Sequence, residues 1–202
     1  MSSDDYEIRA VDTPFQGFFR VDRYRLRHKR YAGDWTPEIE REIFVRGHAA
    51  GVFPYDPKLD RLLLVEQFRL AAALAGRPSH WTLEVPAGIV PEGHDPETVA
   101  RRELAEEAGL AAQSLIPLYT FMPSPGGATE TVWLYAALVD LAGAGGLAGV
   151  AAEHEDIRIV VMETEDAFAR MRRGEIDNAI TLLSLQWLQL NREKLMREAG
   201  SR

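Results

Sequence analysis

The sequence contains no cysteine among its 202 residues. Disulfide bonds, thiolate metal sites and cysteine nucleophiles are therefore excluded. It also lacks an apolar run that could cross a bilayer, which takes about 20 consecutive residues, so we expect no membrane insertion. Met1–Ala10 is polar and acidic and has none of the basic-then-apolar order of a signal peptide. These absences together predict a cytoplasmic protein.

Positive charge is scarce: 23 lysines and arginines stand against 31 acidic residues, and the formal net charge is −8. This balance argues against general nucleic-acid binding, which requires a basic surface. It leaves room for a small anionic substrate, because a bound metal ion can reverse the local sign of the potential. The 46% hydrophobic and 27% charged content is ordinary for a globular chain.

The N-terminal quarter of the sequence predicts three β-strands, over residues 6–11, 18–28 and 38–46, with a turn at Gly33–Asp34. Three strands alone bury little apolar surface, so they must pack on the rest of the chain or on another subunit. We therefore divide the sequence into an N-terminal antiparallel β subdomain, residues 1–48, and a main domain, residues 49–202.

The main domain alternates strand and helix patterns. Residues 71–80 are predicted as a loop, residues 86–88 as a turn, and the Gly/Ala-rich residues 142–152 as a mobile segment. Thr164 is the expected N-cap of a short helix. This alternation predicts an α/β fold, a mixed β-sheet sandwiched between helices. The predicted strands cover 49–54, 61–68, 81–85, 115–121, 129–139 and 157–162, and the predicted helices 96–108, 165–173 and 178–197.

One helix has unusually complete start and stop signals. Asp95 is a good N-cap, Pro96 suits the first helical position, and Glu97 places a negative charge in the first turn. Gly109 is typical of the C′ position that ends a helix. The sequence thus predicts both ends of this helix.

The same helix carries Glu103, Glu106 and Glu107, whose spacing of three and four places them on one face. Like charges at this spacing do not stabilise a helix, whereas clustered carboxylates are the ligands that hard cations require. The alternative is a solvated acidic face with Arg101 and Arg102 beside it, which is the usual meaning of a charge run.

The order of residues favours the metal site. Gly88, followed by R-E-L-A-E-E-A-G-L over residues 102–110, resembles the Nudix box, G-x5-E-x7-R-E-U-x-E-E-x-G-U, in which U is aliphatic. Every defined position matches in register except one, because His94 occupies the place of the first glutamate. The resemblance implies a Nudix fold and hydrolysis of nucleoside diphosphates linked to another group.

The resemblance also assigns roles within the metal site. The backbone carbonyl of Ala87, with Glu103, Glu107 and Glu155, would bind Mg²⁺, with Mn²⁺ as the alternative ion. Glu106 would support this cluster in catalysis. Glu153 would be the general base, carried over the site by a flexible loop. On the residues alone, the acids of this loop are equally well explained as solvated charges.

Further motifs resemble bacterial ADP-ribose pyrophosphatases across nearly the whole chain. They are G-F-F at 17–19, R-E-I-F-V-R-G-H-A-A at 41–50, V-E-Q-F-R at 65–69, S-P-G-G at 124–127 and E-H-E-D-I-R at 153–158. The resemblance implies a domain-swapped homodimer and a nucleoside diphosphate sugar as substrate.

The same likeness proposes substrate-binding residues. Arg69 would contact the diphosphate and Phe18 would stack on the adenine. The remaining candidates are Arg41, Arg46, Ser124 and Gly126. Two alternatives stay open at this stage: Phe18 as a core residue, and the two N-terminal arginines as ordinary strand-face charges.

The expected activity is metal-dependent hydrolysis of ADP-ribose to AMP and ribose 5-phosphate. Another ADP-sugar or GDP-mannose is an alternative substrate, because sequence identifies the diphosphate chemistry better than the base or sugar. A catalytically silent ADP-ribose sensor is a second alternative, and His94 is its only support.

Overall fold

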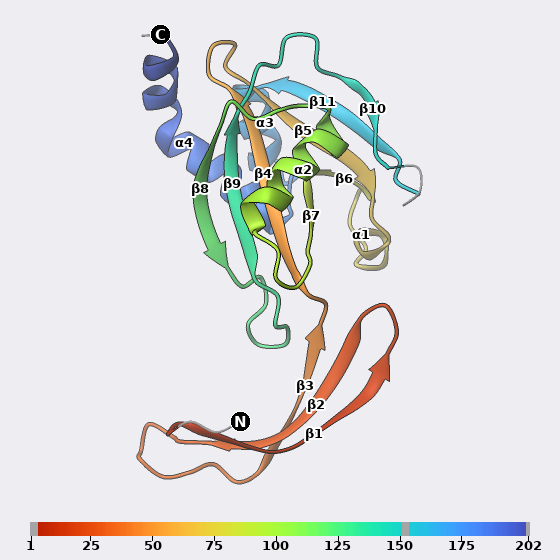
Figure 1. The fold of residues 1–202 in the computed structure, drawn as a ribbon, viewed down its shortest axis with the longest axis vertical. Coiled ribbons are helices and arrows are strands. Elements are labelled where there is room, and N and C mark those ends of the chain that lie inside the picture. The colour runs from red at the N-terminus through yellow and green to blue at the C-terminus, as the bar shows by residue number, and fades with distance from the viewer. Residues whose placement is uncertain (1–3, 151–153, 201–202) are drawn as a thin grey trace. The chain divides into compact units, whose positions relative to one another are not determined.

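The computed structural model describes residues 4–150 and 154–200. The chain forms two compact units (Figure 1). One combines the chain up to His48 with Met122–Thr131, and the other combines Ala49–Phe121 with the chain from Val132 onward. The division predicted from the sequence, at residue 48, assigned the ten residues Met122–Thr131 to the main domain. In the structure they belong to the first unit.

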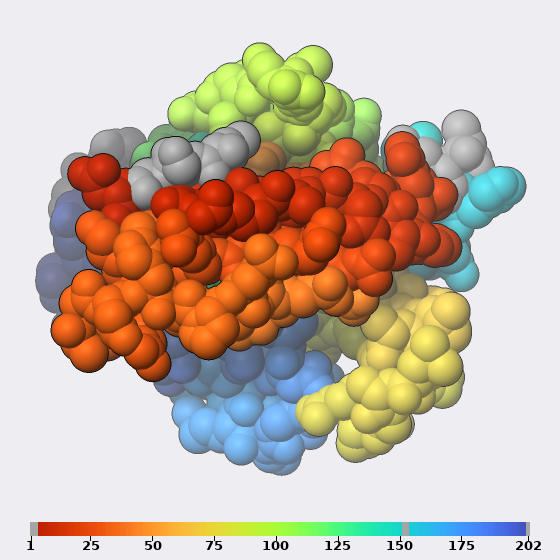
Figure 2. Space-filling model, turned by 90° about the horizontal axis from the view of Figure 1, so that it is seen from below, coloured from red at the N-terminus to blue at the C-terminus, as the bar shows by residue number. Residues whose placement is uncertain are grey.

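The first unit is built on an antiparallel sheet of order β1-β2-β3, whose side chains form one continuous layer in red and orange in Figure 2. Its strands are β1 (Tyr6–Gln16), β2 (Arg20–His28) and β3 (Ile39–Val45). The predicted antiparallel arrangement is confirmed. β1 runs further than predicted because it pairs with β2 as far as Gln16, and Phe18 therefore lies in the connecting turn.

The segment Met122–Thr131 is tied to β3 by main-chain hydrogen bonds. The Phe44 N–H donates to the Gly127 carbonyl (2.8 Å), and the Thr129 N–H donates to the Phe44 carbonyl (3.2 Å). Within the segment, the Ser124 carbonyl accepts the N–H groups of Gly127 and Ala128. The S-P-G-G turn is therefore held against the N-terminal sheet.

The second unit contains a mixed sheet of order β10-β11-β5-β4-β9-β8, with β6 paired to β5 and β7 paired to β4. Strands β4 and β9 run parallel, whereas β5 pairs antiparallel with β4, β6 and β11. Its strands are β4 (His48–Asp56), β5 (Arg61–Phe68), β6 (Trp81–Glu84), β7 (Ala87–Val90), β8 (Ser114–Phe121), β9 (Val132–Leu138), β10 (Gly146–Ala148) and β11 (Ile157–Glu163).

Alternating side chains of this sheet enter two separate cores. On β5, Leu63 and Val65 pack with residues of α2 (Pro96–Ala108), whereas Leu62 and Leu64 pack with residues of α3 (Thr164–Arg172) and α4 (Ala179–Gly200). This two-residue period is that of a strand buried on both faces. In Figure 1, α2 lies in front of the sheet, and α3 and α4 lie behind it. The predicted helix–sheet–helix sandwich is confirmed.

Local features differ from the sequence-based expectations in four places. The predicted loop contains a short helix, α1 (Leu70–Leu74), the predicted turn contains β7, and the Gly/Ala-rich segment contains β10. Strands β7 and β10 form because β4 and β11 offer them main-chain partners, which local composition does not reveal. Thr164 is not the cap of α3: Glu163 holds that position, and the Thr164 hydroxyl donates to the Asp60 carbonyl (2.9 Å).

Helix α4 is 22 residues long, the length of a transmembrane helix, but its second half carries several charged side chains. Across residues 4–150 and 154–200, no helix combines the length and the apolar character that crossing a bilayer requires.

A polar network ties the β4–β5 turn to α4. Asp60, which has a positive φ of 53°, accepts hydrogen bonds from the Tyr55 hydroxyl (2.9 Å) and from Arg192 Nε (2.9 Å). Arg192 also pairs with Glu165 of α3. Burial by itself raises the pKa of Asp60, but the hydrogen bonds from Arg192 and Tyr55 outweigh it and the pKa is lowered.

Replacement of Arg192 by methionine should lower the free energy of unfolding at pH 7 by about 2 kcal/mol, because Asp60 loses its cation. A lowered pKa means that the Asp60 carboxylate stabilises the fold above its unfolded pKa of about 3.9 and that this contribution disappears as the pH falls. Urea unfolding at pH 7 and pH 3 should therefore show the difference between variant and wild type shrinking at low pH. Arg197→Met, at an exposed pair, is the control. An equal difference at both pH values would contradict the ion-pair origin.

Candidate active site

The acidic helix is positioned by the short strands that precede it. β7 pairs with β4, and the Val52 N–H donates to the Pro86 carbonyl (2.9 Å). Asp95 caps α2 by accepting the Thr98 N–H (3.0 Å), and Gly109 ends the helix in the left-handed region (φ 66°). Both predicted ends of this helix are confirmed.

Two of the three helical glutamates are buried, Glu103 at 8% exposure and Glu107 at 3%. Both face β7: Glu107 Oε2 accepts the Ala87 N–H (3.1 Å), and Glu103 lies directly over Gly88. A Cβ atom on Gly88 would be 2.9 Å from Glu103 Oε2 and nearer still to Oε1, so a larger residue here would require the Glu103 carboxylate to move. Glu106 is exposed and pairs with Arg102 (3.4 Å). The single acidic face predicted from spacing is thus half buried and half solvated.

Burial raises the pKa of Glu107 to about 8, and the charges of Glu103 and Glu155 add to the effect. Burial also raises the pKa of Glu103, against the opposing influence of Arg102. Carboxylates removed from water are costly unless a cation compensates them. The atoms of Glu103 and Glu107 that could bind a metal ion are all oxygens, and oxygen ligands suit a hard divalent cation such as Mg²⁺.

The third predicted ligand, Glu155, comes from the segment between β10 and β11. Its Oε2 accepts the Val150 N–H (3.0 Å), and its charge acts on both buried glutamates. Gly149 (φ 106°) allows the close approach, since a Cβ there would be 2.9 Å from the Glu155 Cβ. Glu153, the predicted base, lies outside the described residues. Within the described part of the chain, no three His, Asp or Glu side chains already converge into a cation site.

Arg69 is held by Glu84 at the adjoining edge of the sheet. Arg69 Nη2 lies 2.7 Å from Glu84 Oε2, and Arg69 Nε lies 3.0 Å from Oε1. The hydrogen bond to Glu84 raises the pKa of Arg69, and the charges of Glu107 and Glu155 raise it further. The structure therefore brings Arg69 into the electrostatic environment of the predicted metal ligands. Sequence reasoning did not identify Glu84 as a site residue. The signal that could have identified it is its position two residues after Thr82, on the same face of a strand that pairs with the V-E-Q-F segment of β5.

The remaining candidates belong to the first unit. Phe18 is 87% exposed and packs edge-to-face on Phe19 (4.8 Å), so it is not a core residue of this chain. Arg46 lies over the Phe19 ring (5.7 Å) and pairs with the buried Glu130 (3.1 Å), another residue that the sequence did not single out. The other predicted substrate-binding residues, Arg41, Ser124 and Gly126, are exposed on β3 and on the turn beside it.

Arg46 also contains the one buried side-chain polar atom, among the described residues, that has no hydrogen-bond partner: its Nε. Such atoms are uncommon and ask for an explanation.

His94, at the position that departs from the box pattern, is exposed in the turn before α2. Its Nδ1 lies 3.3 Å from the Glu92 carbonyl oxygen. The box arginine, Arg102, pairs with Glu103 and Glu106 of its own helix. Both of these partners lie within α2.

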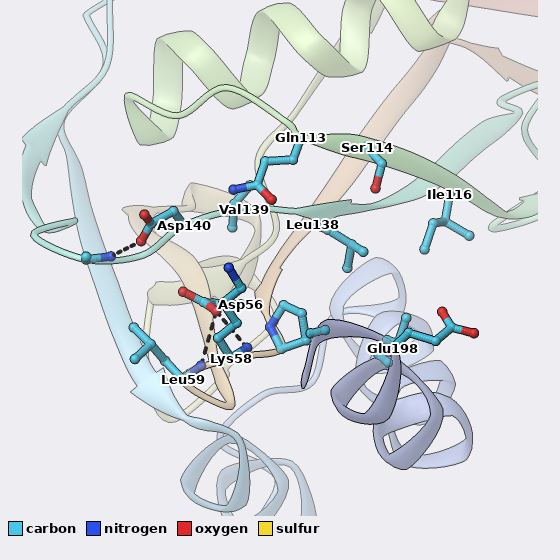
Figure 3. Close-up of a pocket in the computed structure, with 14 residues that line it drawn as sticks. Asp56, Lys58, Leu59, Gln113, Ser114, Ile116, Leu138, Val139, Asp140 and Glu198 are labelled. Atoms are coloured by element: carbon cyan, nitrogen blue, oxygen red, sulfur yellow. Dashed lines mark hydrogen bonds between the residues drawn. The ribbon is translucent and has the colours of Figure 1, made fainter. Parts of the chain in front are cut away.

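A cavity of about 420 Å³ is lined by none of the predicted site residues. Figure 3 shows it among the β4–β5 turn, the start of β8, the end of β9 and the end of α4. Its buried carboxylate, Asp56, is already occupied by the N–H groups of Lys58, Leu59 and Leu141. The chemistry of the acidic cluster is therefore separate from this cavity.

Comparison with known proteins supports the architecture and the box. The ADP-ribose pyrophosphatase of Escherichia coli (strain K12) is 44% identical over 194 residues, which cover 96% of this chain and 92% of that protein. The corresponding Haemophilus influenzae protein is 43% identical over 196 residues, covering 96% and 90%. A GDP-mannose pyrophosphatase of Cronobacter sakazakii is 36% identical over 154 residues, covering 75% and 78%.

A crystal structure of an ADP compounds hydrolase superposes with a TM-score of 0.67 at 20% identity, covering 94% of this chain and 97% of that one, which shows a shared fold. The model of the NUDIX domain matches residues 45–183, the part of the chain that contains the acidic helix. The match covers more than half of the chain and includes the predicted box. The chain therefore belongs to the Nudix family.

Proposed function

We propose that this protein hydrolyses ADP-ribose to AMP and ribose 5-phosphate. The observation that carries the proposal is the buried pair Glu103 and Glu107, held under Ala87 and Gly88 by a helix whose box matches the family pattern. The ADP-ribose pyrophosphatases of two bacteria, aligned over 96% of this chain, support the choice of substrate.

The chemistry requires a positive environment, because the oxygens of a diphosphate repel a nucleophile. Mg²⁺ held by the Ala87 carbonyl, Glu103, Glu107 and Glu155 would neutralise that charge and lower the pKa of water. Glu153 would remove the proton as water attacks one phosphorus in line. The bond between that phosphorus and the bridging oxygen would break, and the other phosphate would leave, so that one product is AMP and the other ribose 5-phosphate.

Two other side chains complete the proposed reaction. Arg69 would stabilise the charge that develops on the phosphate oxygens. Glu106, on the solvated side of the acidic face, would support the cluster of metal ligands.

Recognition of the nucleoside is assigned to the first unit. Phe18 would stack on the adenine, and Arg46, whose side chain is 35% exposed, would contact an anionic or carbonyl oxygen of the substrate. Arg41, Ser124 and Gly126 are the further contacts proposed. Strand β1 and the turn after it expose Val11, Phe15 and Phe18 at 51%, 59% and 87%, which favours a domain-swapped homodimer that covers them.

The experiment that tests the function is incubation of the full chain with ADP-ribose and Mg²⁺, with identification of the products. AMP and ribose 5-phosphate in equal amounts support the proposal. Binding of ADP-ribose without turnover would identify the protein as a sensor and overturn hydrolysis.

GDP-mannose is the second candidate substrate, and the Cronobacter relative is the observation in its favour. It is the weaker candidate, because that alignment covers 75% of this chain against 96% for the Escherichia coli relative. Competition between the two nucleotide sugars in one reaction gives the ratio of their kcat/KM values. A ratio that favours GDP-mannose would keep the mechanism and change the substrate.

Replacement of Phe15 by glutamate should weaken the proposed dimer at least about tenfold, the equivalent of 1.4 kcal/mol. A charge at this exposed apolar position would have to be desolvated in an interface. Light scattering during size-exclusion chromatography across a dilution series measures the change. Leu190→Glu, at an exposed position of α4, is the control and should keep the wild-type mass. A wild-type protein that is monomeric at micromolar concentration would contradict the dimer.

A further inference from the structure

We propose that Glu84 is a positioning residue for the reaction: it holds Arg69 side-on so that the outer edge of the guanidinium faces the diphosphate. The inference deepens the proposed function, since it assigns a residue that acts on the substrate only through Arg69. It explains why a residue expected to bind an anion is already paired with a carboxylate.

The pairing uses only one edge of the guanidinium. Arg69 Nε lies 3.0 Å and 3.3 Å from the two Glu84 oxygens, and Arg69 Nη2 lies 2.7 Å from Oε2. An arginine side chain has five N–H donors in a fixed fork. The pairing leaves both hydrogens of Nη1 and one of Nη2. One hydrogen of each of these two nitrogens forms the end-on edge, which can bind a phosphate with two parallel hydrogen bonds. No other side-chain hydrogen bond or ion pair of Arg69 occurs among the residues that the structure describes.

Glu84 is itself fixed by its own strand. The Thr82 hydroxyl donates to Glu84 Oε1 (2.5 Å), and the two residues, two apart on β6, share one face of the sheet. Glu84 and Thr82 pair in register with Val65 and Gln67 of β5. The chain of contacts from Thr82 to Glu84 to Arg69 therefore starts in regular sheet.

The backbone of Arg69 is anchored as well. Its N–H donates to the His80 carbonyl (2.8 Å), which extends the pairing of β5 and β6 by one step. The Arg69 side chain is 47% exposed and that of Glu84 is 18% exposed, so a ligand can reach the arginine while the carboxylate stays behind it. A free arginine loses rotamer entropy when it is immobilised. Glu84 removes most of that cost before the substrate binds.

Glu84 also determines which acid the arginine contacts. The charges of Glu107 and Glu155 act on Arg69 from the metal side. Without Glu84, Arg69 would be attracted towards these two carboxylates and would compete with a cation for them. The ion pair between Arg69 and Glu84 therefore keeps the guanidinium near the proposed metal ligands but out of direct contact with Glu107 and Glu155.

The test is a double-mutant cycle on the full-length protein with ADP-ribose and Mg²⁺. Glu84→Gln keeps the shape but turns an amide group towards the arginine, and kcat/KM should fall about 10–100-fold, as for other residues that orient a reacting group. Thr82→Val should produce a smaller loss in the same direction. In an Arg69→Met background, adding Glu84→Gln should change kcat/KM less than about twofold, because the two residues act as one unit.

The control removes another glutamate from an arginine pair of the same sheet. Glu163→Gln frees Arg61 at the far end of β5, where the two residues are paired in register. It should leave kcat/KM at the wild-type level. A thermal midpoint measured for each variant separates misfolding from a loss of positioning.

The outcomes separate this inference from the proposed function. An equal loss on adding Glu84→Gln in both backgrounds, or wild-type kinetics for Glu84→Gln alone, overturns the positioning role while the function stands. If the wild type binds ADP-ribose without turnover, the same cycle applied to Kd by calorimetry decides the inference. A wild type that neither binds nor cleaves ADP-ribose overturns both.

Discussion

Glu107→Gln is expected to lower kcat for ADP-ribose hydrolysis at least about 10³-fold, which corresponds to roughly 4 kcal/mol of transition-state stabilisation. The amide has the size of the carboxylate and can still accept the Ala87 N–H, so the fold should persist. What it loses is the negative oxygen that would hold a divalent cation. Initial rates over a Mg²⁺ titration, with AMP as the measured product, give the effect.

The same substitution should stabilise the metal-free protein. Glu107 is 3% exposed, and its pKa is raised by burial to about 8, so its ionised form opposes folding until a cation is bound. Glutamine removes this charge, and we expect a gain of about 1–2 kcal/mol in EDTA. The rise in Tm that Mg²⁺ produces in wild type should disappear in the variant.

The matched control for both effects is Glu97→Gln, at an exposed first-turn position of the same helix, where the glutamate pairs with Arg101. It makes the same chemical change outside the buried face and should leave kcat and the Mg²⁺-dependent rise in Tm unchanged. Turnover by Glu107→Gln within tenfold of wild type would remove this residue from the proposed metal site.

Gly88→Ala is expected to lower kcat/KM about 10²-fold through a single added methyl group, the loss typical when one transition-state contact is removed. The methyl carbon would be 2.9 Å from Glu103 Oε2 and closer to Oε1, so the carboxylate must move away from β7. Glu103 is buried and has little space in which to move. The Mg²⁺ concentration for half-maximal activity should rise together with the loss of rate.

Gly200→Ala adds the same methyl group where no atom of the described structure lies within 4 Å, and it should behave as wild type. A crystal structure or a Mg²⁺ titration of Gly88→Ala would distinguish a displaced carboxylate from general destabilisation. Unchanged activity in that variant would show that Glu103 does not need its present position.

Much of the site could be predicted because its signals are local. Asp95 and Gly109 mark the ends of α2 through capping chemistry that depends only on neighbouring residues. The spacing of Glu103 and Glu107 follows from helical geometry alone. The strand predicted over residues 61–68 is β5. Only the structure shows that its alternate residues enter two cores.

The rest depended on partners distant in sequence. Local spacing places three glutamates on one face, but only the packing of α2 against β7 buries Glu103 and Glu107 and leaves Glu106 in solvent. The position of Arg69 likewise depends on Glu84, fifteen residues away on a neighbouring strand.

By itself, the sequence determined the acidic helix, the strand pattern and the family, because capping, periodicity and motif spacing are properties of neighbouring residues. The tertiary structure decided which carboxylates are buried, which arginine is already paired, and that Met122–Thr131 joins the N-terminal sheet. These features arise from main-chain pairing and desolvation between segments far apart in the chain, and local composition carries no information about such contacts.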